Sequence, residues 1–238
     1  MTADSVRQAL LEVADPARAV QLQRFFRTGP GQYGDGDRFL GPPVPLQRDV
    51  ARRFRDLPPG EVEKLVRNPF HECRFIGLTI WCLQVRRRGA TPAVRADRAA
   101  RYLRLREYVN NWDLVDTTAP TLLGEWLLHS GADRAVLDEL AAAADHLWSQ
   151  RMSLLATLAF IRKGQYADTL RLAGTLLSHR HDLIHKAVGW LLREVGKREP
   201  EALHEVLRAH AARMPRTALR YAIEKLTPVE RKAYLEMK

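Results

Sequence analysis

The sequence predicts an all-α protein built from pairs of helices. Apolar residues recur at helical spacing along almost the whole chain, in roughly a dozen segments of about 8–18 residues joined by short loops. No segment alternates apolar and polar residues between hairpin turns, as a half-buried strand would. The segments, taken in pairs, recur about every 40 residues, which is a period typical of helical-repeat proteins.

This period is that of HEAT-like repeats, and about six of them fit the chain length of 238 residues. Because helix pairs of this kind stack on their neighbours, they form a curved array with one concave face. We therefore expect a single domain over residues 1–238, a right-handed superhelical stack of HEAT-like helix pairs with a basic concave face.

Prolines, glycines and charged residues mark the expected helix boundaries. Pro16 and Pro45 stand where a first helical turn should be, a position that suits proline. Arginines at 86–88 followed by Gly89 form a helix stop signal, which we favour over a DNA contact. The expected helices cover 4–14, 17–27, 46–55, 61–67, the apolar region around Cys73, 92–109, the segment that follows to about 128, 133–144, 148–163, 165–177, 183–197, 201–211, 215–225 and 228–236.

One long irregular segment, residues 29–45, interrupts the helical pattern. Gly29, Gly31 and Gly34 match a G-x-G-x-x-G pattern, but no strand precedes it and no helix begins at it, which excludes a dinucleotide-binding turn. A loop of this length is often functional. The alternative, which we favour, is a connector held between helices.

The charge balance predicts a polyanionic partner. Lys and Arg total 38 against 28 Asp and Glu, a net charge of +10, which attracts phosphate backbones and speaks against a protein-binding scaffold. Cys73 and Cys82 fit neither a zinc ligand pair nor a C-x-x-C motif, so we expect buried, reduced thiols. The N-terminus has no apolar signal region and the most apolar stretch is too short for a membrane span, which predicts a cytoplasmic, nucleoid-associated protein without a membrane partner.

The segment from Val109 to Pro120 carries the most informative pair of side chains. Trp112 and Asp116 are four residues apart, so a helix would place both on one face. A carboxylate beside an indole suits a site that holds a positive charge, through Coulomb attraction and the quadrupole of the ring. Asp113 is expected to cap or support this segment, and Pro120 to kink or restart the helix.

Several passages resemble the AlkD family of bacterial DNA glycosylases, in the expected order and over nearly the whole chain. They are 33–41 (YGDGDRFLG), 109–116 (VNNWDLVD), 147–151 (LWSQR) and 181–194 (HDLIHKAVGWLLRE). The resemblance implies a HEAT-like fold and excision of positively charged alkylated purines, such as 3-methyladenine and 7-methylguanine, from duplex DNA in base excision repair. It implies that Asp116 is the catalytic carboxylate, that Trp112 and Trp190 flank the sugar of the lesion, and that Arg151 is an active-site arginine.

The chemistry of such a substrate agrees with these residue types. A purine alkylated at N3 or N7 already carries a positive charge, so no general acid is needed to make it leave. One carboxylate can stabilise the sugar cation and orient water, and aromatic faces add cation–π attraction of ~0.5–2 kcal/mol. We expect a monofunctional hydrolase that acts as a monomer and uses neither cofactor nor metal. The alternative is a non-catalytic HEAT-repeat protein that binds damaged or structured DNA.

The segment around Trp190 is predicted to contact DNA. Lys186, Trp190 and Arg193 share a helix face, which favours a DNA contact over a core tryptophan with cations that reach solvent. Gly189 is costly inside a helix, so we expect a close approach of a neighbouring helix there. Trp148, by contrast, is expected in the core.

Two other features of the sequence bear on the predicted function. His179, His181 and His185 lack the Cys or carboxylate partners of a metal site. The chain departs from the family at two places, because it has Asp182-Leu183 where some members carry paired aromatic residues and Phe25 where the family has a tyrosine. The first departure implies a different substrate range, and the lost hydroxyl at Phe25 puts any polar role of that position in doubt.

Overall fold

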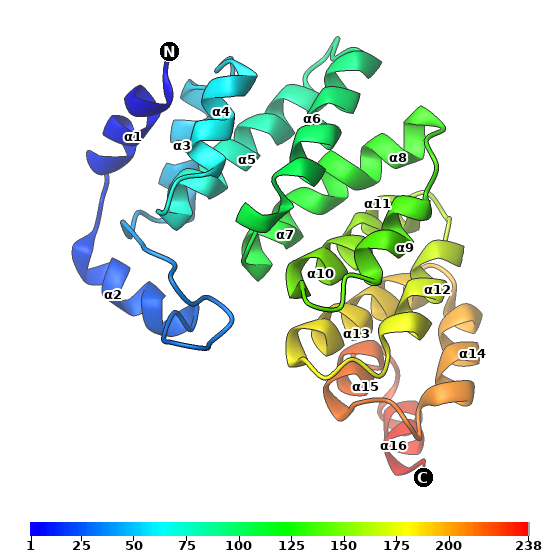
Figure 1. The fold of residues 1–238 in the computed structure, drawn as a ribbon. Helices are drawn as coiled ribbons and strands as arrows, with labels where there is room; N and C mark the ends of the chain where they lie inside the picture. The colour runs from blue at the N-terminus through cyan, green and yellow to red at the C-terminus, as the bar shows by residue number, and fades with distance from the viewer. Residues whose placement is uncertain (238) are drawn as a thin grey trace. The chain divides into compact units, whose positions relative to one another are not determined.

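The computed structural model describes residues 1–237 and confirms the all-α prediction (Figure 1). Within these residues no strand forms, and one isolated bridge joins Arg38 to Phe70. The helices are α1 (Ala3–Leu11), α2 (Pro16–Phe25), α3 (Val44–Arg53), α4 (Pro59–Val66), α5 (His71–Arg86), α6 (Pro92–Arg104), α7 (Trp112–Ala119), α8 (Glu125–Ser130), α9 (Ala135–Ala141), α10 (Leu147–Ala156), α11 (Leu158–Ile161), α12 (Ala167–Leu176), α13 (Asp182–Gly196), α14 (Pro200–His210), α15 (Arg216–Ala222) and α16 (Pro228–Glu236).

The segment after α7 is more broken than the sequence predicts. A π-helical turn, η2 (Pro120–Gly124), separates α7 from α8. Pro120 has no N–H to donate to the carbonyl of Asp116 four residues earlier, so the α-helical ladder fails there. In the widened turn the Glu125 N–H bonds to the carbonyl of Pro120 five residues back. The expected kink at Pro120 is therefore confirmed, as a change of helix type.

The chain divides into two compact units, residues Met1–Trp126 and the part from Leu127 onward. The single-domain organisation stays a prediction. In the first unit α5 is the central helix, because α3, α4, α6 and α7 all pack against it (Figure 1). Cys73 and Cys82 lie on α5 as buried free thiols, as expected, and burial raises the pKa of each to about 12. Neither thiol is a nucleophile at neutral pH.

In the second unit α13 is central, with α10, α12, α14 and α15 packed around it. The predicted close approach at Gly189 is confirmed. A Cβ at this position would lie 2.3 Å from the carbonyl oxygen of Ala218 and 2.6 Å from the Cβ of Tyr221, both on α15. Trp148 is buried in the core, also as expected. Among residues 1–237 no helix combines the length and the apolar composition needed to cross a bilayer.

Gly189→Ala should therefore destabilise the protein by about 1–3 kcal/mol, because α13 and α15 would have to separate. Urea unfolding measures the change. Gly174→Ala is the matched control, since a Cβ on this helical glycine meets no atom within 4 Å. We expect that control to be neutral or stabilising by up to ~1 kcal/mol. Equal destabilisation by the two substitutions would contradict the packing argument.

Candidate active site

The first two turns of α7 present the two residues that the sequence singles out. The Asn111 side chain caps the helix by accepting a hydrogen bond of 2.9 Å from the N–H of Trp112. Trp112 and Asp116 both lie in α7, so the expected i, i+4 pairing on one helix face is present. Both residues are half-buried, whereas Leu114, Val115, Thr118 and Ala119 of the same helix are buried.

Aromatic side chains from the end of α2 hold the Trp112 indole. The ring of Phe26 stacks on Trp112 with centroids 5.5 Å apart and planes inclined by 24°. Phe25 lies edge-on to the same indole at 6.0 Å and is 63% exposed. Phe26 also stacks on Phe39, with ring centroids 5.1 Å apart. Phe25 is thus a direct neighbour of Trp112.

A cavity of about 210 Å³ opens beside this cluster. Trp112 and Asp113 line it, together with mostly apolar side chains, whereas Asp116 is not among the described residues of its wall. The lining residues are Arg18, Leu22, Phe25, Phe26, Phe39, Pro42, Val44, Gln47, His71, Glu72, Phe75, Trp112 and Asp113.

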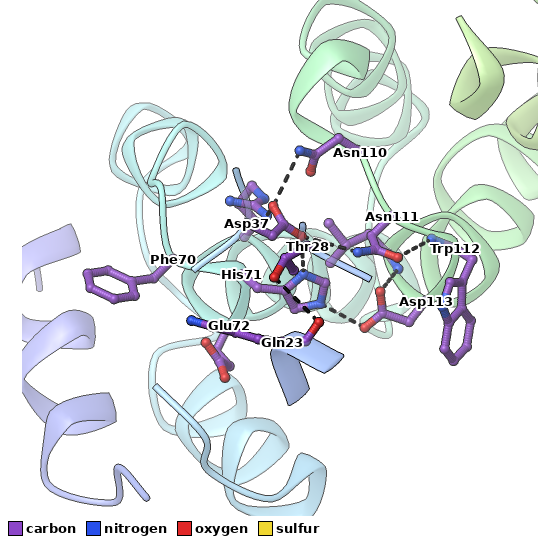
Figure 2. A network of polar contacts seen from close by, with 12 residues as sticks. Gln23, Thr28, Asp37, Phe70, His71, Glu72, Asn110, Asn111, Trp112 and Asp113 are labelled. Carbon is purple, nitrogen blue, oxygen red and sulfur yellow. Dashed lines mark hydrogen bonds and ion pairs between the residues drawn. The ribbon is translucent and has the colours of Figure 1, made fainter. Parts of the chain in front are cut away.

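A buried polar network adjoins Trp112, and Figure 2 shows its residues converging from three segments. His71, at the start of α5, has its Nδ1 3.1 Å from Asp37 Oδ2 and its Nε2 2.8 Å from Asp113 Oδ2. Asp37 also accepts hydrogen bonds from the Arg74 guanidinium and, at 3.1 Å, from the Asn111 amide. The prediction that Asp113 supports the segment structurally is confirmed, while the capping residue is Asn111.

The geometry fixes the charge of His71. An ionised carboxylate only accepts hydrogen bonds, so both ring nitrogens must donate, which makes the ring a cation. Burial alone would lower the pKa of His71, but the attraction and hydrogen bond of Asp113 and those of Asp37 outweigh it and raise the pKa to about 9. Burial alone would raise the pKa of Asp37, but the His71 hydrogen bond and the Arg74 charge lower it below its usual value.

The raised pKa of His71 predicts how stability depends on pH. Protonated His71 gains two carboxylate partners on folding. Their contribution to stability is complete below pH 6.5, the pKa of histidine in the unfolded chain, and disappears as the pH rises through about 9, its pKa in the folded protein. The free energy of unfolding in urea should therefore fall between about pH 6 and pH 9.5 more steeply for the wild type than for His71→Gln. Parallel pH dependences of the two proteins would contradict the assignment of the proton to His71.

Glu72 fastens the long loop to the same end of α5. Its Oε2 accepts the Leu40 N–H at 3.0 Å and its Oε1 accepts the Gly41 N–H at 2.9 Å. Gly41 has φ 89°, and a Cβ there would lie 2.0 Å from the carbonyl oxygen of Asp15. The favoured interpretation of residues 29–45 as a tied connector between helices is thus confirmed.

Sequence reasoning missed this network, although a signal for it exists. The residues His71, Glu72 and Arg74 introduce three charged or titratable groups into an otherwise apolar helix. Buried charges need partners, so such a run predicts ion pairs with distant acidic or amide groups.

The remaining predicted residues belong to the second unit. Arg151 of α10 is 4% exposed, and its guanidinium donates to the carbonyl of Leu183. Lys186, half-buried Trp190 and Arg193 all lie on α13, as expected. Their role in DNA contact, like that of Arg151, stays a prediction.

Both cations of α13 have acidic neighbours. Lys186 lies 2.8 Å from Asp182, which is four residues earlier on the same helix. The Arg193 side chain is 16% exposed and forms an ion pair with Glu224 in the turn after α15. A phosphate that approached either cation would compete with these carboxylates.

The side chains of the three histidines before and within α13 form hydrogen bonds with backbone groups of the same segment. His179 Nδ1 accepts the His181 N–H at 3.0 Å, and His181 Nδ1 accepts the Leu183 N–H at 3.1 Å. In the described part of the chain no group of three His, Cys, Asp or Glu side chains is arranged to hold a metal ion.

Fold and site together define a class: an all-α helical protein with an indole and a carboxylate on one partly exposed helical turn. A family model described as DNA alkylation repair enzyme matches residues 6–226. A solved structure described as a predicted DNA alkylation repair enzyme from Enterococcus faecalis is 18% identical in sequence, with a TM-score of 0.69 over 90% of this chain and 97% of that one. No match was found among curated proteins. The chain therefore belongs to the DNA alkylation repair enzyme family.

Proposed function

We propose that this protein is a monofunctional DNA glycosylase that releases positively charged alkylated purines from duplex DNA in base excision repair. The observation that carries the proposal is the start of α7, where Trp112 and Asp116 stand one helical turn apart and are both partly exposed. Membership of a DNA alkylation repair family supports a role on alkylated DNA.

The proposed reaction is hydrolysis of the N-glycosidic bond. The bond between C1′ and the purine nitrogen breaks, and its electron pair leaves with the base, which becomes neutral. The Asp116 carboxylate stabilises the positive charge that develops on the sugar and orients a water molecule. The water oxygen then bonds to C1′, and its proton passes to Asp116 or to solvent. The Trp112 face adds cation–π attraction to the charged lesion.

The binding part of the proposal uses cations. A net charge of +10 draws the protein to the phosphate backbone. We assign Arg151, Lys186 and Arg193 to contacts with DNA, and Trp190 to the sugar of the lesion. A monomer in the cytoplasm, associated with the nucleoid, fits this substrate.

The experiment is a base-release assay. The protein is incubated with duplex DNA methylated by a radiolabelled methyl donor, and the soluble products are separated by chromatography. Free 3-methyladenine or 7-methylguanine is the expected result. Tight, salt-sensitive binding to the same DNA without release would overturn the proposal and favour a non-catalytic damage-binding protein.

A further inference from the structure

We propose that His71 is a positioning residue, whose contact with Asp113 holds the first turn of α7 against α5 and so sets the place of the Trp112 indole. The activity part of this inference rests on the proposed function. The positioning itself does not, and it can be measured without any reaction.

The contacts of His71 link three segments that are far apart in the chain. The ring lies on α5, Asp37 belongs to the loop 34 residues earlier, and Asp113 belongs to α7 42 residues later. Figure 2 shows the imidazole between the two carboxylates, with Trp112 next to Asp113. The loop also reaches α7 directly, because Asp37 accepts a hydrogen bond from the Asn111 amide. The imidazole adds the contact between α5 and Asp113 of α7.

An aromatic route runs parallel to the polar one. The imidazole of His71 stacks on Phe39 with centroids 4.8 Å apart and lies 5.0 Å from Phe26. Phe26 in turn stacks on Trp112. The ring of His71 therefore reaches α7 twice, through the Asp113 carboxylate and through the face of Phe26.

The charges around His71 explain why its contacts with Asp37 and Asp113 need a cationic ring. Asp37 and Asp113 face the ring directly, and the Arg74 guanidinium faces it across Asp37. Glu72 beside it is occupied by the loop amides. If His71 loses a proton, one ring nitrogen becomes an acceptor that points at a carboxylate, which is repulsive and weakens that contact.

Two amide substitutions separate the two contacts of the ring. In His71→Gln the amide nitrogen can occupy the place of Nε2 and donate to Asp113, whereas in His71→Asn it can occupy the place of Nδ1 and donate to Asp37. If the contact to Asp113 positions Trp112, kcat for base release should stay within about threefold of wild type in His71→Gln and fall about 10–100-fold in His71→Asn. Equal kcat values in the two variants would overturn the inference.

A spectroscopic titration tests the same inference without base release. The near-UV circular dichroism of Trp112 is obtained as the difference between wild type and Trp112→Phe, which cancels the signals of the tyrosines and of the other tryptophans. This difference should change with a midpoint near 9, the value to which the surroundings raise the pKa of His71. The change should be absent in His71→Gln and retained in the control His129→Gln, whose imidazole is exposed on α8.

A flat difference spectrum across this pH range would overturn the inference. A change in the spectrum from a protein that releases no base would leave the positioning role standing while the glycosylase proposal fails, so the two failures are distinguishable.

Discussion

Asp116→Asn should reduce the release of 3-methyladenine and 7-methylguanine by about 100-fold or more. The substitution keeps the shape of the side chain but removes the negative charge that stabilises the sugar cation, an electrostatic effect worth about 10²–10³ in rate for a single group. Single-turnover measurements with excess protein on methylated duplex DNA report this step separately from product release.

The matched control is Asp49→Asn, which makes the same chemical change on an exposed part of α3. Release by this control should equal that of wild type, and the binding of both variants to undamaged duplex should stay within a few-fold. If Asp116→Asn released bases as fast as wild type, Asp116 would not be the catalytic carboxylate.

Arg74→Met should destabilise the protein by about 3–5 kcal/mol. Both Arg74 and Asp37 are buried, and removing one member of a buried ion pair leaves the other charge without compensation. His71 remains beside Asp37, but it already shares its charge with Asp113. Equilibrium unfolding in urea at neutral pH measures the loss.

Arg86→Met on the same helix is the control for this change. Arg86 pairs with Glu125 at 2.7 Å, but its side chain is 52% exposed, and an exposed ion pair contributes about 0–1 kcal/mol. Similar losses in the two variants would show that burial of the pair is not what makes Arg74 important.

Local sequence signals predicted the helices and some of their packing. Prolines at the starts of α2 and α3 and the arginines before Gly89 predict helix boundaries. The observed boundaries lie within a few residues of these positions. Gly189 predicted a close helix contact because glycine inside an apolar helix has a local cost that packing must offset. Such signals are contained in one helix, so a sequence without structure can reveal them.

The partners of the site residues could not be predicted, because they are distant in the chain. The sequence places Arg193 on an open face with Trp190, but Glu224, 31 residues later, pairs with it. Asp37 looks like one polar residue in a glycine-rich loop, yet its hydrogen bond to Asn111 spans 74 residues. The contacts of Phe25 and Phe26 with Trp112 likewise join residues that are more than 80 positions apart in the chain.

The attachment of the long loop has a consequence for the order of folding. Glu72 accepts hydrogen bonds from the amides of Leu40 and Gly41 in this loop. The loop carboxylate of Asp37 bonds to His71 and Asn111, which are 34 and 74 residues away in the chain. The Glu72 and His71 contacts need α5 in place, and the Asn111 contact needs the start of α7 as well. Closing such long spans early would be entropically expensive. The loop is therefore the last part of the first unit to form, and in native-state hydrogen exchange its amides should open at a lower free energy than those of α5.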